Sequence, residues 1–257
     1  MAVADQTLLK RRLRGALRRH SFPGIFHLPL LESLEDVGPV VLFGGMIRDF
    51  ALYPPKLFSS DIDLVVDGDD WAIERCLERF NATTNRFGGY RLMLGSRTVD
   101  IWALRQTWAF TSGHVAGHTF QELTQTTFFN WDAAVYELRS GTLHCLDNYF
   151  ELLQSRVLDI NLEANPNPAG NVLRALRLAF SGEAKLGARL TKYLLRFLDS
   201  ADSRDFGVYS GVLERKSLDT IAKHLSHHLD VDSAEPFDIR NTQLRLSLPE
   251  RFVAAAP

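Results

Sequence analysis

The stretch Val40-Val41-Leu42-Phe43-Gly44-Gly45 decides the architecture of the first half of this 257-residue chain. Four consecutive apolar residues before two glycines predict a short buried strand that runs into a tight turn. Residues 46–52 predict a helix after this turn, which ends near Pro54 and Pro55 because proline lacks the backbone donor that a helix interior uses. The sequence therefore predicts a strand–turn–helix unit at residues 40–52.

Three further β-type runs follow this unit, at residues 61–66, 90–94 and 98–104. They are rich in the branched and aromatic residues that favour strands. The acidic turn at residues 67–70 precedes a predicted helix at residues 71–80, because carboxylates stabilise the positive N-terminus of a helix. The first half is therefore predicted to be an α+β domain, with a small mixed β-sheet flanked by helices.

From Val172 onward the apolar residues recur at helical spacing, for example at Leu190 and Leu194. The preceding segment Asn165-Pro166-Asn167-Pro168-Ala169-Gly170 predicts an irregular break, since proline and glycine disfavour regular elements. We therefore expect two domains, an α+β head at residues 1–160 and a helical neck and body at residues 161–257.

The N-terminal twenty residues form a basic segment whose apolar residues Leu9, Leu13, Ala16 and Leu17 recur at helical spacing. Its basic residues are Lys10, Arg11, Arg12, Arg14, Arg18 and Arg19. Three interpretations stay open: the solvated face of an amphipathic helix, a phosphate-contacting patch, and an organellar transit peptide. The whole chain has 29 basic and 31 acidic residues, so it is not basic throughout.

Composition also indicates a cellular compartment. No apolar run approaches the roughly 20 residues needed to cross a bilayer, so an integral membrane protein is excluded. Cys76 and Cys145 lack the spacing of a redox or metal motif and cannot form a disulfide framework. They favour a reducing environment, and we expect a cytoplasmic protein.

Three acidic residues lie on predicted strands. Asp61 and Asp63 are two residues apart, so their side chains project to the same face. Asp100 is flanked by the strand-forming residues Val99 and Ile101, and neighbouring strands would bring all three carboxylates together. Carboxylate oxygens suit magnesium, and two such ions can activate an attacking hydroxyl and stabilise a leaving oxygen in phosphoryl transfer. The sequence therefore predicts a catalytic metal site formed by these three aspartates.

The glycine turn adds a second functional element. Without side chains, Gly44 and Gly45 let backbone amides approach a triphosphate at the positive N-terminus of the following helix. Arg48, one turn into that helix, is positioned to add a charged donor. This order of motifs favours a nucleotide-binding site.

In this order, the motifs resemble the head domain of bacterial CCA-adding enzymes and poly(A) polymerases, in the polymerase-β-type nucleotidyltransferase superfamily. The resemblance extends over residues 38–180, and its segments are 43–49, 61–66, 86–89, 99–105, 132–136, 147–153 and a neck-helix-like stretch at 173–179. It implies that Asp61, Asp63 and Asp100 bind two magnesium ions, while the glycines and Arg48 seat a nucleoside triphosphate. The implied reaction joins a nucleoside monophosphate to an RNA 3′-hydroxyl and releases pyrophosphate.

The chain also departs from this family. Residues 126–132, Thr-Thr-Phe-Phe-Asn-Trp-Asp, replace a stretch that begins Arg-Arg-Asp in the family. Residues 167–171, Asn-Pro-Ala-Gly-Asn, replace the neck motif Glu-Asp-x-x-Arg, whose side chains pair with the incoming base. Only residues 181–257 follow the neck-like stretch, where CCA-adding enzymes usually continue into body and tail domains. We therefore expect a diverged relative without a tail domain and with relaxed base selection, rather than faithful CCA synthesis.

The predicted function is that of a metal-dependent nucleotidyltransferase. The expected nucleotide donor is an NTP, with ATP as the leading candidate, and the expected acceptor is an RNA 3′ end such as that of tRNA. Protein and small-molecule hydroxyls are the other acceptors considered. Arg174 and Arg177 are predicted either to neutralise the triphosphate or to form ion pairs with the head domain. The alternative functions are a catalytically retired regulator that binds nucleotide or RNA, and a partner-binding module that acts through the basic N-terminal segment.

Overall fold

The computed structural model describes residues 2–3, 5–18, 28–54, 57–58, 60–85, 88–95, 97–200, 215–231 and 235–241. The basic residue Arg19, Pro55 and the motif residues Arg86 and Phe87 lie outside these ranges. The chain divides into two compact units, Met1–Gln154 and Ser155–Pro257. The boundary expected from the sequence, at residue 160, lies inside the second unit.

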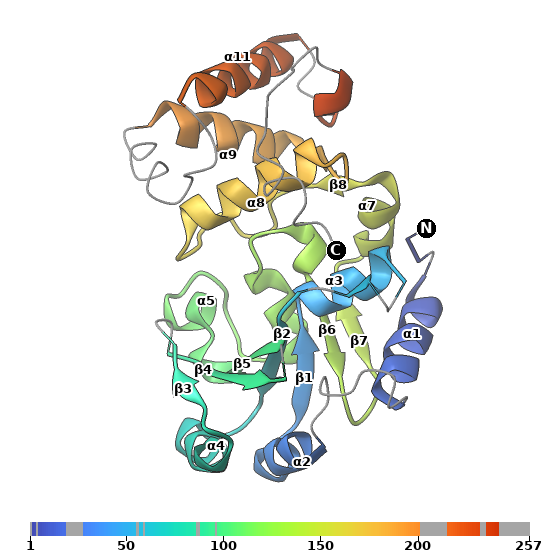
Figure 1. Ribbon diagram of the computed structural model, residues 1–257, viewed down its shortest axis with the longest axis vertical. Coiled ribbons are helices and arrows are strands. Elements are labelled where there is room, and N and C mark those ends of the chain that lie inside the picture. The colour runs from blue at the N-terminus through green and yellow to red at the C-terminus, as the bar shows by residue number, and fades with distance from the viewer. Residues whose placement is uncertain are drawn as a thin grey trace. The chain divides into compact units, whose positions relative to one another are not determined.

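A seven-stranded mixed sheet forms the centre of the first unit (Figure 1). The strand order is β3-β4-β5-β2-β1-β6-β7, in which β2 and β5 are parallel and the other neighbouring pairs are antiparallel. The strands are β1 (Val40–Phe43), β2 (Ile62–Val66), β3 (Thr83–Thr84), β4 (Tyr90–Leu94), β5 (Arg97–Ala103), β6 (Ala134–Glu137) and β7 (Leu143–Cys145). The predicted α+β class with a mixed sheet is confirmed.

Short helices surround this sheet. They are α1 (Gln6–Arg18), α2 (Leu28–Val37), α3 (Gly45–Leu52), α4 (Asp70–Leu77), α5 (Trp108–Thr111), α6 (Phe120–Leu123) and α7 (Tyr149–Ser155), with 3-10 turns η2 (Glu78–Phe80), η3 (Leu104–Gln106), η4 (Thr124–Thr126) and η5 (Asn130–Asp132). Helix α3 packs against β1, β2 and β6, while α2 and α4 pack against each other. The helices predicted at residues 46–52 and 71–80 are confirmed as α3 and as α4 with η2.

The central strands are buried on both faces, which explains their continuous apolar sequence. Every residue of β1 except Phe43 is buried, and so is every residue of β2 except Asp63. Strands covered on both faces need apolar side chains at successive positions rather than alternating ones. An aspartate within such a strand is therefore an exception that needs a functional or structural reason.

Residues 6–18 of the basic N-terminal segment form α1, which agrees with the amphipathic helix among the three open interpretations. Its residues Leu9, Leu13 and Ala16 are buried, and the helix contacts α3. The Arg12 guanidinium donates to the carbonyl oxygens of Phe50 at 2.9 Å and Tyr53 at 3.2 Å. These carbonyls lie at the C-terminal end of α3, where helix carbonyls lack partners within the helix. The Arg12 side chain therefore fastens α1 to the end of α3.

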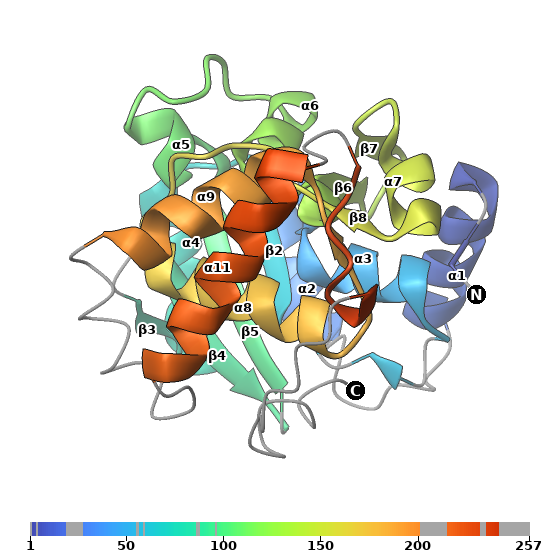
Figure 2. The same ribbon diagram turned by 90° about the horizontal axis from the view of Figure 1, so that it is seen from above.

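The second unit is mostly helical, as expected from its spacing of apolar residues. Its elements are β8 (Val157–Leu158), α8 (Pro168–Phe180), β9 (Lys185–Leu186), α9 (Ala188–Asp199), α11 (Arg215–Val231) and η6 (Ile239–Asn241). Strands β8 and β9 form a parallel pair, and α9 packs against α11 (Figure 2). Among the described residues, no helix has both the length and the apolar character required to span a bilayer.

One expectation about this unit was wrong. The irregular break predicted at residues 165–170 is interrupted by α8, which begins at Pro168. Proline is tolerated at the first helical position because the amide it lacks has no partner there. The Asn167 side chain caps the helix by accepting a hydrogen bond of 3.3 Å from the Gly170 amide. Local capping therefore outweighs the helix-breaking tendency of proline and glycine.

Candidate functional site

The structure brings the three predicted aspartates together. Asp63 and Asp100 are register partners on the parallel strands β2 and β5, and Asp61 immediately precedes β2. Burial, and then the negative charges of Asp100 and Asp61, raise the pKa of Asp63 well above its ordinary value. The register pairing and this influence of charge place the three aspartates in one region of the sheet. Their catalytic and metal-binding roles stay predictions.

The predicted glycine turn lies beside these aspartates. Gly44 precedes α3 with φ 65° and ψ −121°, a conformation that a residue with a Cβ rarely adopts. A Cβ added at Gly45 would lie 3.4 Å from the Cβ of Ser60, the residue before Asp61. The Gly44 amide donates to the Ala134 carbonyl at 3.1 Å, so Gly44 serves to shape the turn. The Ile47 and Arg48 amides donate to the Gly44 carbonyl at 3.0 and 3.2 Å, so the amides of Gly45 and Met46 are the candidates to bind an anion.

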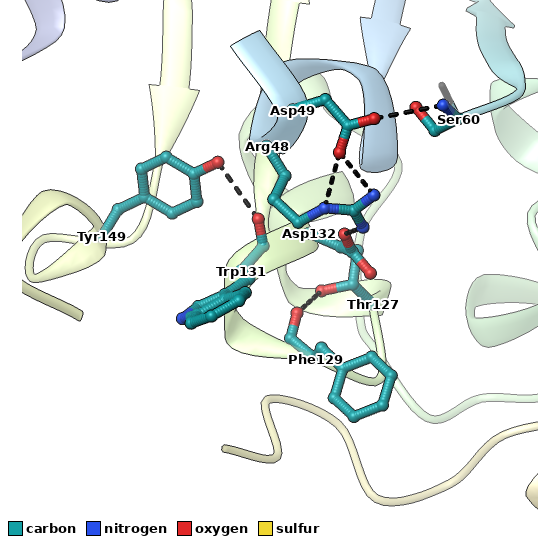
Figure 3. Close-up of polar contacts among 8 residues, drawn as sticks. All are labelled: Arg48, Asp49, Ser60, Thr127, Phe129, Trp131, Asp132 and Tyr149. Atoms are coloured by element: carbon teal, nitrogen blue, oxygen red, sulfur yellow. Dashed lines mark hydrogen bonds and ion pairs between the residues drawn. The ribbon is translucent and has the colours of Figure 1, made fainter. Parts of the chain in front are cut away.

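Arg48 is enclosed by two carboxylates (Figure 3). Its Nε and Nη2 donate to Asp49 Oδ1 at 3.0 and 2.7 Å, and its Nη1 donates to Asp132 Oδ1 at 2.5 Å. Asp49 Oδ2 accepts from the Ser60 amide at 3.1 Å. The network therefore connects α3, the 3-10 turn η5 and the residue that leads into the aspartate-bearing strand β2.

Burial makes this network strong. The Arg48 side chain is 13% exposed. Although burial lowers the pKa of Arg48, the charges of Asp132 and Asp49 raise it overall, so the guanidinium stays protonated. Burial raises the pKa of Asp132 against the opposing effect of Arg48. Every guanidinium nitrogen of Arg48 is committed inside the protein, and its expected contact with a triphosphate stays a prediction.

A second arginine, which the sequence analysis did not identify, binds Asp100. Arg91 Nε donates to Asp100 Oδ1 at 2.7 Å and Nη2 donates to Asp100 Oδ2 at 2.6 Å. The two residues are register partners on β4 and β5. A hairpin signal was present in the sequence, since the length of a hairpin loop sets which residues face each other. If Leu94 faces Arg97 across the turn at Gly95, then Arg91 faces Asp100.

The segment that replaces the family's Arg-Arg-Asp motif is held by aromatic packing. Phe128, Phe129 and Trp131 are buried, and the two phenylalanine rings pack edge to face with centroids 4.8 Å apart. Thr127 Oγ1 donates to the Phe129 carbonyl at 2.9 Å, and Tyr149 Oη donates to the Trp131 carbonyl at 3.1 Å (Figure 3). The segment contributes a single acidic group, Asp132, which pairs with Arg48.

The remaining two predicted residues lie in the second unit. Arg174 and Arg177 are half-buried and lie nearly one turn apart on α8. The structure thus confirms their placement on a helix. Their contribution to a triphosphate site stays a prediction.

The donor set has the chemistry of a divalent cation site. Within the described ranges, no three acidic, histidine or cysteine side chains form a ready-made metal-binding group. Hard carboxylate oxygens at Asp61 and Asp63, together with the excess negative charge around Asp63, nevertheless suit magnesium. Asp100 differs, because both of its oxygens bind Arg91. The residues therefore fit magnesium, provided that Asp100 changes its partner.

The first unit is thus a mixed sheet with aspartates on its central strands, next to a glycine turn and a short helix. Solved structures of CCA-adding enzymes share this fold. The Thermotoga maritima CCA-adding enzyme complexed with tRNA is 20% identical with a TM-score of 0.50, over 86% of this chain and 62% of that chain. A CCA-adding enzyme complexed with CTP is 19% identical with a TM-score of 0.50, over 89% and 62%. A tRNA-processing enzyme in an apo form is 20% identical with a TM-score of 0.52, over 84% and 61%.

These similarities confirm, at the level of the fold, the resemblance predicted from the motifs. The chain spans about three fifths of the length of these structures. No model of a known protein family matches the chain. No curated protein matches it either.

Proposed function

We propose that this protein is a magnesium-dependent nucleotidyltransferase that uses two ions and transfers a nucleoside monophosphate from an NTP, ATP first, to an acceptor hydroxyl. The proposed acceptor is an RNA 3′ end, such as that of tRNA, ahead of protein and small-molecule hydroxyls. The observation that carries the proposal is the meeting of Asp61, Asp63 and Asp100 beside the Gly44-Gly45 turn. Structures with this fold contain CTP, ATP or tRNA, which supports these substrate classes.

In the proposed reaction, the acceptor oxygen attacks the α-phosphorus of the NTP. A new phosphorus–oxygen bond forms, the bond between the α-phosphorus and the bridging oxygen breaks, and pyrophosphate leaves. Asp61, Asp63 and Asp100 would hold magnesium, which when bound supplies charge neutralisation and lowers the pKa of the attacking hydroxyl. The first amides of α3, beginning at Gly45, would bind phosphate oxygens.

Other residues of the chain support this geometry. The buried pairs of Arg48 with Asp49 and Asp132 hold the glycine turn and the residue before Asp61 in place. Arg174 and Arg177 would neutralise charge on the nucleotide. With aromatic residues in place of the Arg-Arg-Asp motif, we infer a relaxed choice of base. Cys76 and Cys145 are free thiols, which agrees with a cytoplasmic enzyme.

Incubation of the purified chain with each α-labelled NTP, magnesium and total RNA tests the proposal. We expect labelled RNA and an equal amount of pyrophosphate. The double variant Asp61→Asn plus Asp63→Asn should lose at least about 100-fold in rate. Mutation of the hydrogen-bond partners of metal ligands already costs about 10- to 100-fold, and these two residues are the proposed ligands themselves. Asp67→Asn is the matched control, because this exposed aspartate follows the same strand.

Absence of label transfer to RNA, protein and small molecules would contradict the proposal, as would full activity in the double variant.

A catalytically retired regulator on the same fold is the second candidate. The bidentate Arg91–Asp100 pair favours it, because this pair engages both oxygens of one predicted metal ligand. For this function we expect NTP binding by calorimetry with no pyrophosphate released during long incubation. Pyrophosphate release that depends on Asp61 and Asp63 would eliminate this candidate.

A further inference from the structure

The Arg91–Asp100 pair is asymmetric in its exposure to solvent. The Asp100 side chain is 7% exposed on the central strand β5, whereas the Arg91 side chain is 51% exposed on β4. The carboxylate is therefore held in place by the sheet, and the guanidinium is free to leave toward water. When Arg91 leaves, its guanidinium can be solvated, whereas the buried Asp100 carboxylate requires another positive partner.

Arg91 also faces more than one carboxylate. Its register partner is Asp100, whose own register partner on the other side is Asp63, so the three residues form one row across β4, β5 and β2. The hydrogen bonds and charge of Asp100, followed by the charges of Asp61 and Asp63, raise the pKa of Arg91. The Arg91 guanidinium thus binds Asp100, the carboxylate directly beside Asp63 in the sheet, and its charge acts on the other two aspartates as well.

We propose that Arg91 is an internal counter-ion that competes with divalent cations for Asp100 and thereby sets the metal affinity of the site. The proposal rests on the proposed function only for the identity of the metal ligands. A divalent cation at Asp100 would lie close to the Arg91 guanidinium, and the two positive charges repel each other, so withdrawal of Arg91 favours cation binding. Arg91 is a positioning residue in this scheme, because it acts through Asp100.

A polyphosphate is the kind of ligand that would favour the withdrawal of Arg91. The planar guanidinium fork that binds the carboxylate bidentately also matches phosphate oxygens. Arg48 is less suited to this task, since it is buried and both of its partners are internal. Arg91 therefore couples metal binding to the arrival of a phosphate-bearing substrate.

Direct Mn²⁺ binding, followed by electron paramagnetic resonance of the free ion without nucleotide, tests the proposal. We expect Arg91→Gln to bind Mn²⁺ about 10-fold more tightly than the natural chain, a typical size for coupling between two groups. Arg91→Lys keeps the charge but not the bidentate fork, so its affinity should lie between the two. Arg75→Gln is the matched control, because it removes an exposed arginine that stacks on Trp71, away from the aspartates.

The double variant Arg91→Gln plus Asp100→Asn should lose the gain in Mn²⁺ affinity, which assigns the effect to Asp100. Unchanged or weaker Mn²⁺ binding by Arg91→Gln and Arg91→Lys would overturn the proposal, as would the absence of Mn²⁺ binding by every variant. Because no substrate is present, the outcome is separate from that of the transfer assay. Tighter Mn²⁺ binding by Arg91→Gln without nucleotide transfer would support the counter-ion role and contradict the proposed enzyme activity. Nucleotide transfer with unchanged Mn²⁺ binding by Arg91→Gln would support the enzyme activity and contradict the counter-ion role.

Discussion

Within the described part of the first unit, two arginine–carboxylate groups differ mainly in burial. Arg48 is 13% exposed and binds Asp49 and Asp132, whereas Arg91 is 51% exposed and binds Asp100 alone. Both arginines make short charge-assisted hydrogen bonds to carboxylate oxygens. Access to water separates the two arginines, because Arg48 cannot leave its carboxylates without a large desolvation penalty, whereas the half-exposed Arg91 can be solvated when it leaves. The first group therefore suits a structural support, and the second suits an exchangeable contact.

The largest effect expected from this comparison is on replacement of Arg48. Arg48→Met leaves Asp49 and Asp132 buried without a cation, and loss of one member of such a group typically costs about 3–5 kcal/mol. Urea unfolding followed by circular dichroism measures this loss. Arg48→Lys should cost less, since the charge remains while the fork that reaches both carboxylates is lost. A cost below about 1 kcal/mol for Arg48→Met would show that burial does not distinguish the two groups.

An intermediate effect is expected at Asp63, in the opposite direction. Burial and the neighbouring aspartates raise the folded-state pKa of Asp63 above its unfolded value, so the folded chain retains a proton that the unfolded chain has released. Stability therefore falls as pH rises through this window and levels off above the folded-state pKa. Asp63→Asn cannot titrate, and its unfolding midpoint should exceed that of the natural chain by a few degrees at pH 8 in EDTA.

The gain from Asp63→Asn should shrink as pH falls and disappear well below the ordinary aspartate pKa of 3.8, where the carboxyl is protonated in both states. Thermal unfolding across this pH range measures the difference. A gain independent of pH would mean that ionisation of Asp63 is not its cause.

The smallest effect is expected on replacement of Arg91. Arg91→Gln should lower the unfolding free energy by about 1 kcal/mol, less than Arg48→Met, since a single carboxylate loses its cation and the Gln amide can still donate a hydrogen bond to it. Measurement in EDTA and then with Mn²⁺ should show that the ion stabilises Arg91→Gln more than the natural chain. A loss as large as that of Arg48→Met would place Arg91 among the structural supports and argue against exchange.

Much of the fold was predictable because its signals are local. The apolar runs of β1 and β2 and the glycines of the turn each depend on a few adjacent residues, and their boundaries agree with the structure within one residue. The error at Pro168 had a local cause too, since a proline at the first helical position was interpreted as a helix breaker.

The site was predictable only in part. The side chain of Asp132 lies 84 residues from Arg48 along the chain, and no local pattern indicates that the two form a pair.

The amino-acid sequence alone determined strands β1, β2, β4 and β5, the glycine turn and the choice of the three aspartates as candidates, because propensity and side-chain spacing act between neighbouring residues. The short strands β3, β6 and β7 were not predicted. Tertiary structure decided which charges are matched: Arg48 is buried between two carboxylates, while Arg91 meets Asp100 at the exposed edge of the same cluster. The physical reason is that the energy of a charge depends on its distance from other charges and from water, and both are set only when distant segments pack together.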